Sequence, residues 1–524
     1  MSLRVAVVGA GPAGIYASDL LLRNDEHDIH VDLFEQMPAP FGLIRYGVAP
    51  DHPRIKGIVK SLHKVLDKPH LRLLGNITIG RDITIDELRD YYDAVVISTG
   101  AVRDRELRIP GGEKSIGAGE FVGFYDGNPR FERDWNLDAR EVAVIGVGNV
   151  ALDISRILAK TGDELLVTEI PDNVYESLKN NKAETVHMFG RRGPAQAKFT
   201  PKELREMDLS DTIQVLVDPE DIDYDATSEE VRRADKSVDL NCQVLEQYAM
   251  REPDDAPHKI YIHFFEEPVE VLTDDSGAIT GLRTERQELD GNGGITGTGK
   301  FTDWPVQQVY HAVGYRSEPV DGVPFDVERN VIPNDGGHVL ETIEDGAGFE
   351  DKLYVTGWIK RGPIGLIGNT KSNAKETTDM LIADASTGKL APVAHRPGRN
   401  SRTARRAQHP LHHLGRLVPI GRGRAQAGRA VCPAARAQED RRVGGNGRAR
   451  PRRPVSGLVP VCRRRSARQA LSWSACNGWP GSARSRSHCW RSRRPGWRSR
   501  RSPRASPIGA RGRSSAPSTS GRCC

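Results

Sequence analysis

The sequence predicts an α/β fold with two Rossmann-like dinucleotide-binding domains, followed by a tail that we expect to be disordered. Three observations favour this organisation. A strand, a glycine-rich turn, a helix, a second strand and an acid follow one another at the start of the chain. A second strand–turn–helix unit begins near residue 141, and the composition changes abruptly near residue 393.

The first unit occupies residues 4–35. Residues 5–8 are an apolar run of the kind that forms a buried parallel strand, and residues 30–34 form a second such run. Between them lie the turn GAGPAG and a segment long enough for a helix. A GxGxxG pattern alone is weak evidence, but in this context it predicts a dinucleotide site.

Each part of this turn has a physical role. Gly9 permits the tight turn, Gly11 lets the backbone approach a pyrophosphate, and Gly14 lets the helix pack closely against the strand. The helix N-terminus supplies free N–H groups and a partial positive charge for the phosphates. Glu35 follows Gly14 by 21 residues, where its carboxylate can accept hydrogen bonds from ribose hydroxyls.

The segment after this unit is rich in loops. Residues 36–60 contain several prolines and glycines, and we expect them to wrap a ligand. Residues 55–66 have the apolar spacing of a helix, with lysines on the opposite face. The other elements expected here are a strand at 77–79, a helix at 83–91 capped by Thr84 and Glu87, and a buried strand at 92–100.

The second unit repeats the opening pattern with the GxGxxA turn of residues 146–151. Two complete units suggest two separate dinucleotides. The next strand of this unit is followed by Arg191 and Arg192 rather than by an acid. Paired guanidinium groups suit a 2′-phosphate, while a solvated loop is the alternative interpretation. We therefore assign FAD to the first unit and NADP to the second.

Five segments carry a resemblance to a known family. They are VAVVGAGPAGIYAS, PAPFGLIRYGVAPDHPRIK, VIGVGNVALDISRIL, FGRRGPAQAKFTPKELREM and YVTGWIKRGPIGLIGNTKSNAKET. In this order and spacing, the chain resembles the adrenodoxin reductase-type ferredoxin–NADP reductases over about residues 1–392. The resemblance implies an NADP domain inserted into an FAD domain. The implied limits are 1–102 and 313–392 for the FAD domain, 103–312 for the NADP domain and 393–524 for the tail.

The resemblance also implies site residues. Those matched to FAD contacts are Gly9, Gly11, Ala13, Gly14, Glu35, Leu43, Trp358, Gly365, Leu366 and Ile367. Those matched to NADP contacts are Arg103, Asn149, Val150, Arg191, Arg192 and Glu203, and the GxGxxA turn itself adds Gly146 and Gly148. His52 and Glu206 match an ionisable catalytic pair near the reacting rings, and a histidine can relay a proton near neutral pH. The alternatives are a hydrogen bond to the proline turn for His52 and a solvated helix face for Glu206. The sequence assigns no metal ligand.

The implied function is that of a flavoprotein oxidoreductase. It takes a hydride from NADPH onto FAD and passes electrons singly to a ferredoxin-type iron–sulfur protein, since flavin handles both kinds of transfer. Residues 1–392 hold only Cys242, so neither a redox-active cysteine pair nor a built-in cluster is expected. We expect Cys242 to be a small buried residue. Another FAD/NADPH oxidoreductase, such as a diaphorase or a monooxygenase, is the alternative.

Charge divides the chain into two parts. Residues 393–524 contain 32 arginines, no lysine and two acids, a net charge of +30. Since the whole chain carries +5, residues 1–392 carry −25. A usually acidic ferredoxin would therefore need a local basic patch, for which the candidates are Arg232, Arg233, Lys236 and Arg251.

The composition of the tail is open to two interpretations. Without apolar periodicity it should be disordered, and a genuine tail of this kind could bind nucleic acid. Loss of lysine with excess arginine is also typical of an out-of-frame reading of a GC-rich gene, in which case nucleic acid is not a partner. The low cysteine content before residue 393 and the absence of a signal peptide or an 18-residue apolar run favour a cytoplasmic protein without a membrane span.

Overall fold

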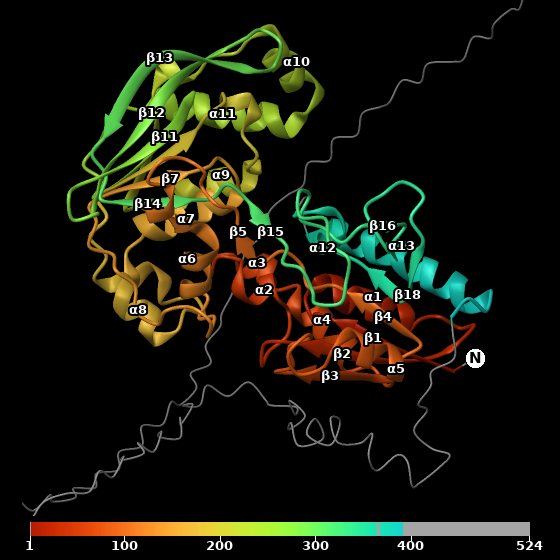
Figure 1. The fold of residues 1–524 in the computed structure, drawn as a ribbon. Helices are drawn as coiled ribbons and strands as arrows, with labels where there is room; N and C mark the ends of the chain where they lie inside the picture. The colour runs from red at the N-terminus through yellow and green to blue at the C-terminus, as the bar shows by residue number, and fades with distance from the viewer. Residues whose placement is uncertain (1, 364–366, 391–524) are drawn as a thin grey trace, which may run out of the picture. The chain divides into compact units, whose positions relative to one another are not determined.

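The computed structural model describes residues 2–363 and 367–390 (Figure 1). A seven-stranded sheet forms around the first glycine turn, in the order β16-β17-β18-β4-β1-β2-β3. Strands β18, β4, β1, β2 and β3 are parallel to one another, and β16 and β17 add an antiparallel edge. The strands are β1 Ser2–Val8, β2 Asp28–Glu35, β3 Leu71–Gly75, β4 Ala94–Ile97, β16 Asn334–Asp335, β17 His338–Leu340 and β18 Phe349–Val355.

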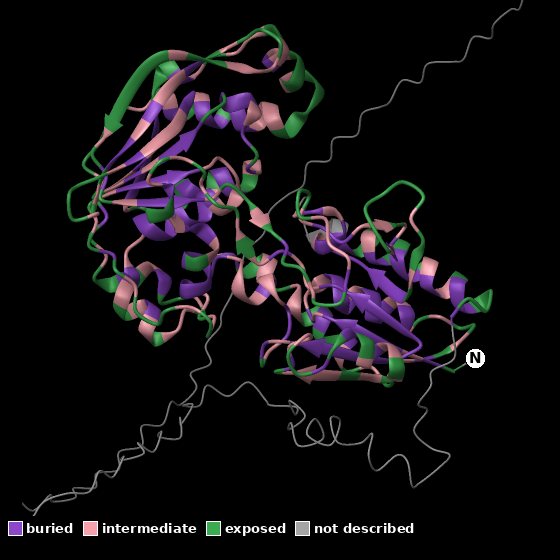
Figure 2. Cartoon of the chain, viewed as in Figure 1, coloured by how far each residue is buried: buried purple, intermediate pink, exposed green. Residues whose placement is uncertain are grey.

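Helices cover both faces of this sheet, which explains why β1 is an unbroken apolar run rather than an alternating one. Val5 and Val7 pack in one cluster with α1, α4 and α13, while Ala6 and Val8 pack in another with α5. Figure 2 shows the central strands of this sheet as mostly buried, whereas the edge strand β3 is not. The helices of this part are α1 Pro12–Leu21, α2 Leu43–Tyr46, α3 Pro53–Lys56, α4 Val59–Leu66, α5 Ile85–Tyr91, α12 Trp358–Arg361 and α13 Ile367–Ser386.

A six-stranded parallel sheet forms around the second glycine turn, in the order β6-β14-β7-β8-β10-β9. Its strands are β6 Ile116–Gly117, β7 Glu141–Ile145, β8 Thr185–Gly190, β9 Ile213–Val217, β10 His258–Phe264 and β14 Gln308–His311. The helices beside it are α6 Ala118–Tyr125, α7 Asn149–Ala159, α8 Asp172–Lys179, α9 Pro201–Glu206, α10 Ala226–Ala234 and α11 Lys236–Ala249. The described chain thus has two parallel sheets, each with its own glycine turn, and the predicted fold class is confirmed.

Two smaller sheets complete the architecture. An antiparallel sheet, β11 Glu266–Thr273, β12 Ile279–Leu289 and β13 Ile295–Trp304, follows directly after β10. The ribbon of β5 Arg103–Asp104 and β15 Tyr315–Arg316 pairs the segment that leaves the first sheet with the segment that returns to it. The expected domain limits at 102 and 313 fall beside this ribbon, and they stay a prediction.

The expected elements differ from the structure in two places. Residues 77–79 do not form a strand and make only an isolated bridge between Ile79 and Ile83, whereas the edge strand β3 was not expected. The expected helix at 55–66 is two helices, α3 and α4, separated by Gly57 and Ile58. Both residues keep helical dihedral angles, but the hydrogen bonds of Ile58 to Ile55 and of Lys60 to Gly57 span three residues instead of four. The capping box of Thr84 and Glu87 is confirmed, and Cys242 is fully buried as expected.

The tail lies outside the described residues, so both interpretations of residues 393–524 stay untested. Among residues 2–363 and 367–390, no helix combines the length and apolar character needed to span a bilayer.

A stack of aromatic rings fills the space between β8, β10 and β13. His263 lies 4.4 Å from Trp304, measured between ring centroids, and its Nε2 is 3.0 Å from Nδ1 of His187. Burial lowers the pKa of His263 to about 3, and it also lowers the pKa of His187. The folded protein therefore holds His263 neutral at pH values where an unfolded histidine, with a pKa near 6.5, binds a proton.

This difference predicts that His263 makes the protein sensitive to acid. Stability from a lowered histidine pKa is complete above pH 6.5 and declines as the pH falls towards 3. Between pH 7 and pH 5 the wild-type free energy of unfolding should fall by about 2 kcal/mol more than that of His263→Phe, which keeps a ring in the stack. Urea unfolding followed by tryptophan fluorescence measures this, with the exposed His63→Gln as the control. Equal falls in wild type and His263→Phe would contradict the assignment.

Candidate functional site

The first glycine turn has the geometry that a phosphate cradle requires. Gly9 has φ +105°, and a Cβ there would lie 2.6 Å from the carbonyl oxygen of Ser98. A Cβ on Gly14 would lie 2.0 Å from the carbonyl oxygen of Gly9. A Cβ on Gly11 would instead meet nothing within 4 Å. Gly11, the N-cap of α1, therefore faces open space at a helix N-terminus, where a pyrophosphate can approach.

Glu35 is fixed beside this turn at the end of β2. Its Oε2 accepts a hydrogen bond from the amide of Ala10, and its Oε1 accepts one from the amide of Met37, both at 2.9 Å. Burial raises the pKa of Glu35, and these amides counteract part of that effect. Each oxygen retains a lone pair, so the carboxylate is held rigidly and can still accept ribose hydroxyls.

Segments from both ends of the described chain meet at the first turn. The amide of Phe41 donates to the carbonyl of Ala10 at 2.8 Å, which places Leu43, the start of α2, close by. A Cβ on Gly357, which has φ +79°, would lie 2.7 Å from Cβ of Ala13. Trp358 therefore begins α12 against the first turn of α1. Gly365 and Leu366 lie outside the described residues, and Ile367 is described only as the first residue of α13.

The second turn repeats the geometry of the first. Gly146 has φ +133°, and a Cβ there would lie 2.7 Å from the carbonyl oxygen of Ala312. A Cβ on Gly148, the N-cap of α7, would meet nothing within 4 Å. Asn149 accepts a hydrogen bond from the amide of Thr200 through its Oδ1 at 2.8 Å, so it connects α7 to α9. Val150, the next residue of α7, packs at the edge of the main core.

The remaining residues expected at the NADP site are charged. Arg191 and Arg192 follow β8 directly and are both exposed. Arg191 lies 3.5 Å from Glu267, whereas Arg192 makes no side-chain ion pair or hydrogen bond in the described part of the chain. Arg103 is paired with Glu318 at 2.7 Å. Glu203 is buried in α9, and its amide is capped by Thr200.

His52 and Glu206 are brought together. His52 is 4% exposed and is the N-cap residue of α3, and its Nδ1 lies 3.0 Å from Oε2 of Glu206, at the end of α9. The pair is in contact but is not aligned as a hydrogen bond. On the other side of the ring, Nε2 lies 2.8 Å from Oδ1 of Asp153. The imidazole is therefore held between two carboxylates from two different helices.

Arg156 organises this cluster. Its side chain is 1% exposed and binds both oxygens of Asp51 at 2.8 Å in a bidentate pair. Its Nη2 also lies 2.9 Å from Asp153 Oδ1 and from His52 Nε2. Lys160 adds a second cation 2.9 Å from Asp51. Burial alone would raise the pKa of Asp51, but the hydrogen bonds and charges of Arg156 and Lys160 outweigh it and hold that pKa well below its usual range.

The number of hydrogens on Arg156 determines which groups donate and which accept hydrogen bonds in this cluster. Nη2 of Arg156 has two hydrogens and three acceptors in reach, namely Asp51, Asp153 and His52. Both carboxylates are served if Arg156 donates to Asp51 and Asp153 and His52 donates to Asp153 from Nε2, and the 2.9 Å approach of Nη2 to Nε2 is then a contact between two donors. This assignment leaves Nδ1 of His52 without a hydrogen, facing Glu206.

His52 and Glu206 were predicted as site residues from the sequence, whereas Asp51, Asp153 and Arg156 were not. A signal was present, because Asp153 and Arg156 interrupt the apolar run of α7 at positions i and i+3 and are nonetheless buried. Charged residues are rarely buried in this way unless they are paired.

Two of the four residues of the basic patch expected for docking are neutralised. Arg232 forms ion pairs with Glu229, Asp239 and Glu246, and Arg251 forms a bidentate pair with Asp208. The other two, Arg233 and Lys236, are exposed and form no ion pair among the described residues, so part of the expected patch keeps its charge.

Comparisons with known proteins agree with this geometry. Residues 3–189 match the family model "Pyridine nucleotide-disulphide oxidoreductase". The chain is 40% identical over 396 residues to NADPH-ferredoxin reductase FprA of Mycobacterium tuberculosis, which covers 74% of this chain and 84% of that protein. It is 36% identical over 411 residues to human mitochondrial NADPH:adrenodoxin oxidoreductase, covering 75% of this chain and 81% of that protein.

Comparison with a solved structure supports the same relationship. The solved structure of M. tuberculosis FprA in complex with NADPH matches with a TM-score of 0.71 and 37% identity, covering 79% of this chain and 90% of that one. With two parallel sheets, two open glycine turns and relatives of this similarity, the chain belongs to the adrenodoxin reductase-type ferredoxin–NADP reductases.

Proposed function

We propose that this protein is an NADPH–ferredoxin reductase that binds FAD at the first glycine turn and NADP(H) at the second. The observation that carries the proposal is the cluster around His52. It joins the segment that follows the first turn to α7, the helix that begins at the second turn. In this proposal His52 handles a proton between the two dinucleotide sites, where a hydride would pass from one to the other.

The first turn fits FAD. The open position at Gly11 and the helix N-terminus suit the pyrophosphate, and the fixed carboxylate of Glu35 suits a ribose. Ala13, Leu43 and Trp358 are proposed to contact the same molecule, with Gly365, Leu366 and Ile367 as further contacts that the described residues do not test. When bound, FAD supplies the conversion of a two-electron hydride into single electrons.

The second turn fits NADP(H) in the same way. Gly148 leaves room for the pyrophosphate, and Arg192, whose side chain has no ion pair among residues 2–363 and 367–390, can bind a 2′-phosphate. Arg191 can join it by leaving its long contact with Glu267. His52 and Glu206 are proposed to hold and move a proton beside the reacting rings, while Asp153 and Arg156 keep the imidazole in position.

The acceptor is proposed to be a separate iron–sulfur protein. Residues 1–392 offer no cysteine pair to carry electrons as a disulfide, since Cys242 stands alone and is buried. The second candidate function is that of a diaphorase or a monooxygenase. Such an enzyme would use the same two nucleotide sites but would pass its electrons to a different acceptor. A cytoplasmic location is proposed from the low cysteine content of residues 1–392.

A different basic surface can dock the acceptor. Arg54, Lys60 and Lys64 on α3 and α4 are exposed and form no ion pair among the described residues. Lys60 and Lys64 are four residues apart on one helix face, a spacing at which like charges repel. This uncompensated charge lies in a body of net charge −25, and it begins two residues after His52. An acidic protein docked there would be close to the proposed reaction site.

One prediction of the proposed function concerns the choice of nicotinamide nucleotide. Arg192→Ala should raise the KM for NADPH about tenfold or more, because a charge-assisted hydrogen bond contributes about 1.5–3 kcal/mol. The KM for NADH should hardly change, since NADH has no 2′-phosphate. Steady-state kinetics with both nucleotides measure this, and Arg329→Ala, an equally exposed and unpaired arginine, is the matched control. An equal effect on both nucleotides would contradict the assignment.

Another prediction of the proposed function concerns the electron acceptor. The purified protein should reduce two molecules of a one-electron ferredoxin for each NADPH consumed. The Lys60→Glu/Lys64→Glu variant should raise the KM for ferredoxin and weaken its dependence on ionic strength, because rim charges steer association. Reduction of ferricyanide by NADPH should not change.

Lys300→Glu, at an exposed and unpaired lysine of β13, is the control and should behave as wild type. If the double variant reduces ferredoxin as wild type does, the docking surface lies elsewhere. If no ferredoxin is reduced while oxygen or quinones are, the proposed function is wrong.

A further inference from the structure

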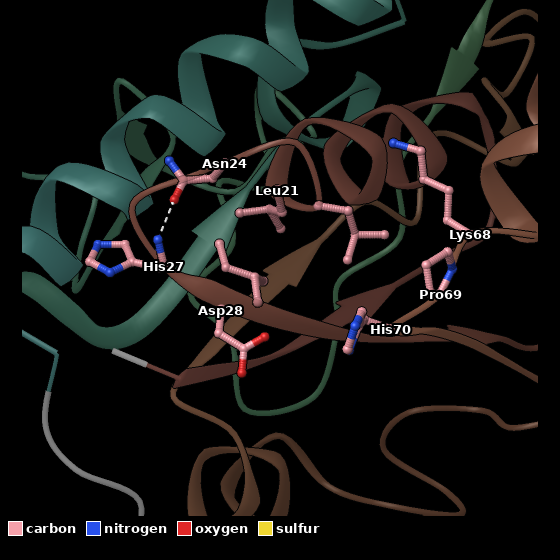
Figure 3. Close-up of a pocket in the computed structure, with 9 residues that line it drawn as sticks. Leu21, Asn24, His27, Asp28, Lys68, Pro69 and His70 are labelled. Carbon is pink, nitrogen blue, oxygen red and sulfur yellow. Dashed lines mark hydrogen bonds between the residues drawn. The ribbon is translucent and has the colours of Figure 1, made fainter.

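Three donor side chains gather at the end of β2 that is remote from the glycine turn. Asp28 and His30 are two residues apart on β2, so they point to the same face of the sheet, and His70 directly precedes β3. Val31 donates its amide to the carbonyl of His70, which fixes the register of the two strands. Figure 3 shows Asp28, at the start of β2, and His70, just before β3, among the residues that line a cavity.

The distances among these side chains suit one small cation. Nδ1 of His30 and Nδ1 of His70 are 3.0 Å apart, and Oδ1 of Asp28 is 3.4 Å from Nε2 of His30. One donor atom from each of the three residues lies within 4.8 Å of the other two. In a tetrahedral site with metal–nitrogen bonds of about 2.0–2.1 Å, two nitrogens are separated by about 3.3 Å. His30 meets His70 through Nδ1 and Asp28 through Nε2, so its ring must turn to present one nitrogen to an ion shared by all three residues.

The two histidines already meet through Nδ1. One imidazole can donate to the other there, a contact that holds only while at least one of the rings is neutral. His70 also has φ +65°, a left-handed conformation that is uncommon outside glycine but is adopted more often by histidine than by most other residues. The backbone thus holds His70 in an uncommon conformation that brings its ring within 4.3 Å of the ring of His30.

The surroundings tolerate a cation. Lys68 lines the adjacent cavity of about 300 Å³, but its Nζ is 2.7 Å from Asp19, so its charge is already paired. The side chains of His30 and Asp28 are 43% and 61% exposed, which leaves the fourth coordination position open to water.

We propose that Asp28, His30 and His70 form a surface site for a divalent transition ion of the Zn²⁺ class. Two imidazoles and one carboxylate are typical ligands of such ions. A bound ion would join β2 to β3, the edge strand of the seven-stranded sheet. His30 lies five residues before Glu35 on β2, about 16 Å away along the strand, so the site is separate from the proposed dinucleotide sites.

The test compares Zn²⁺ binding by the full chain and by three variants. Competition with a chromophoric chelator counts tightly bound Zn²⁺ per FAD-loaded protein. We expect His30→Gln/His70→Gln to bind one equivalent less than wild type, a difference that does not depend on any binding by residues 391–524. Asp28→Asn should weaken the same equivalent at least about tenfold, since even partners outside the coordination shell contribute that much.

The matched control is His27→Gln, since His27 lines the same cavity but its ring contacts Ser386 at 3.0 Å. It should bind as many equivalents as wild type. NADPH oxidation with ferricyanide should be the same in all variants, which separates this test from that of the proposed function. Equal Zn²⁺ stoichiometry in wild type and in the double-histidine variant would overturn the proposal. So would an equal loss in His27→Gln.

Discussion

The buried guanidinium of Arg156 is the interaction on which the site depends. It comes from α7, which starts at the second glycine turn, and it binds Asp51 from the loop that follows the first sheet's opening unit. A buried charge with one partner removed is strongly destabilising, so Arg156, Asp51 and Asp153 must be kept together. His52 follows Asp51 directly, and its position is therefore set by the same ion pair.

The glycine turns impose a second constraint on the chain. Gly9 and Gly146 adopt backbone conformations that side chains rarely tolerate, and each lies against a carbonyl of a neighbouring strand. Gly11 and Gly148 instead leave the helix N-termini open. The first type of glycine closes the turn and the second type leaves room for a ligand. The two turns show the same division of roles, although only the first is followed by a fixed acid.

Much of this organisation could be predicted from the sequence because its signals are local. The glycine turns, the apolar strands and the capping box of Thr84 each depend on neighbours within a few residues. Strand β3 was missed because its residues are only partly buried at a sheet edge, so its pattern is weak. The ion pair of Arg156 with Asp51 was missed because the two residues are 105 positions apart in the sequence. The neutralisation of Arg232 was also missed, because its contact with Glu246 depends on how α10 and α11 pack against each other.

A double-mutant cycle between Arg156 and His52 tests most directly whether the arginine acts through the histidine. Arg156→Lys keeps the charge but loses the planar fork, and FAD content shows whether each variant is folded. The measurement is the anaerobic stopped-flow rate of flavin reduction by NADPH in wild type, Arg156→Lys, His52→Gln and the double variant. The account predicts that Arg156→Lys slows the reaction when His52 is present and adds little once His52 is replaced. Fully additive effects would contradict it and would assign Arg156 a purely structural role.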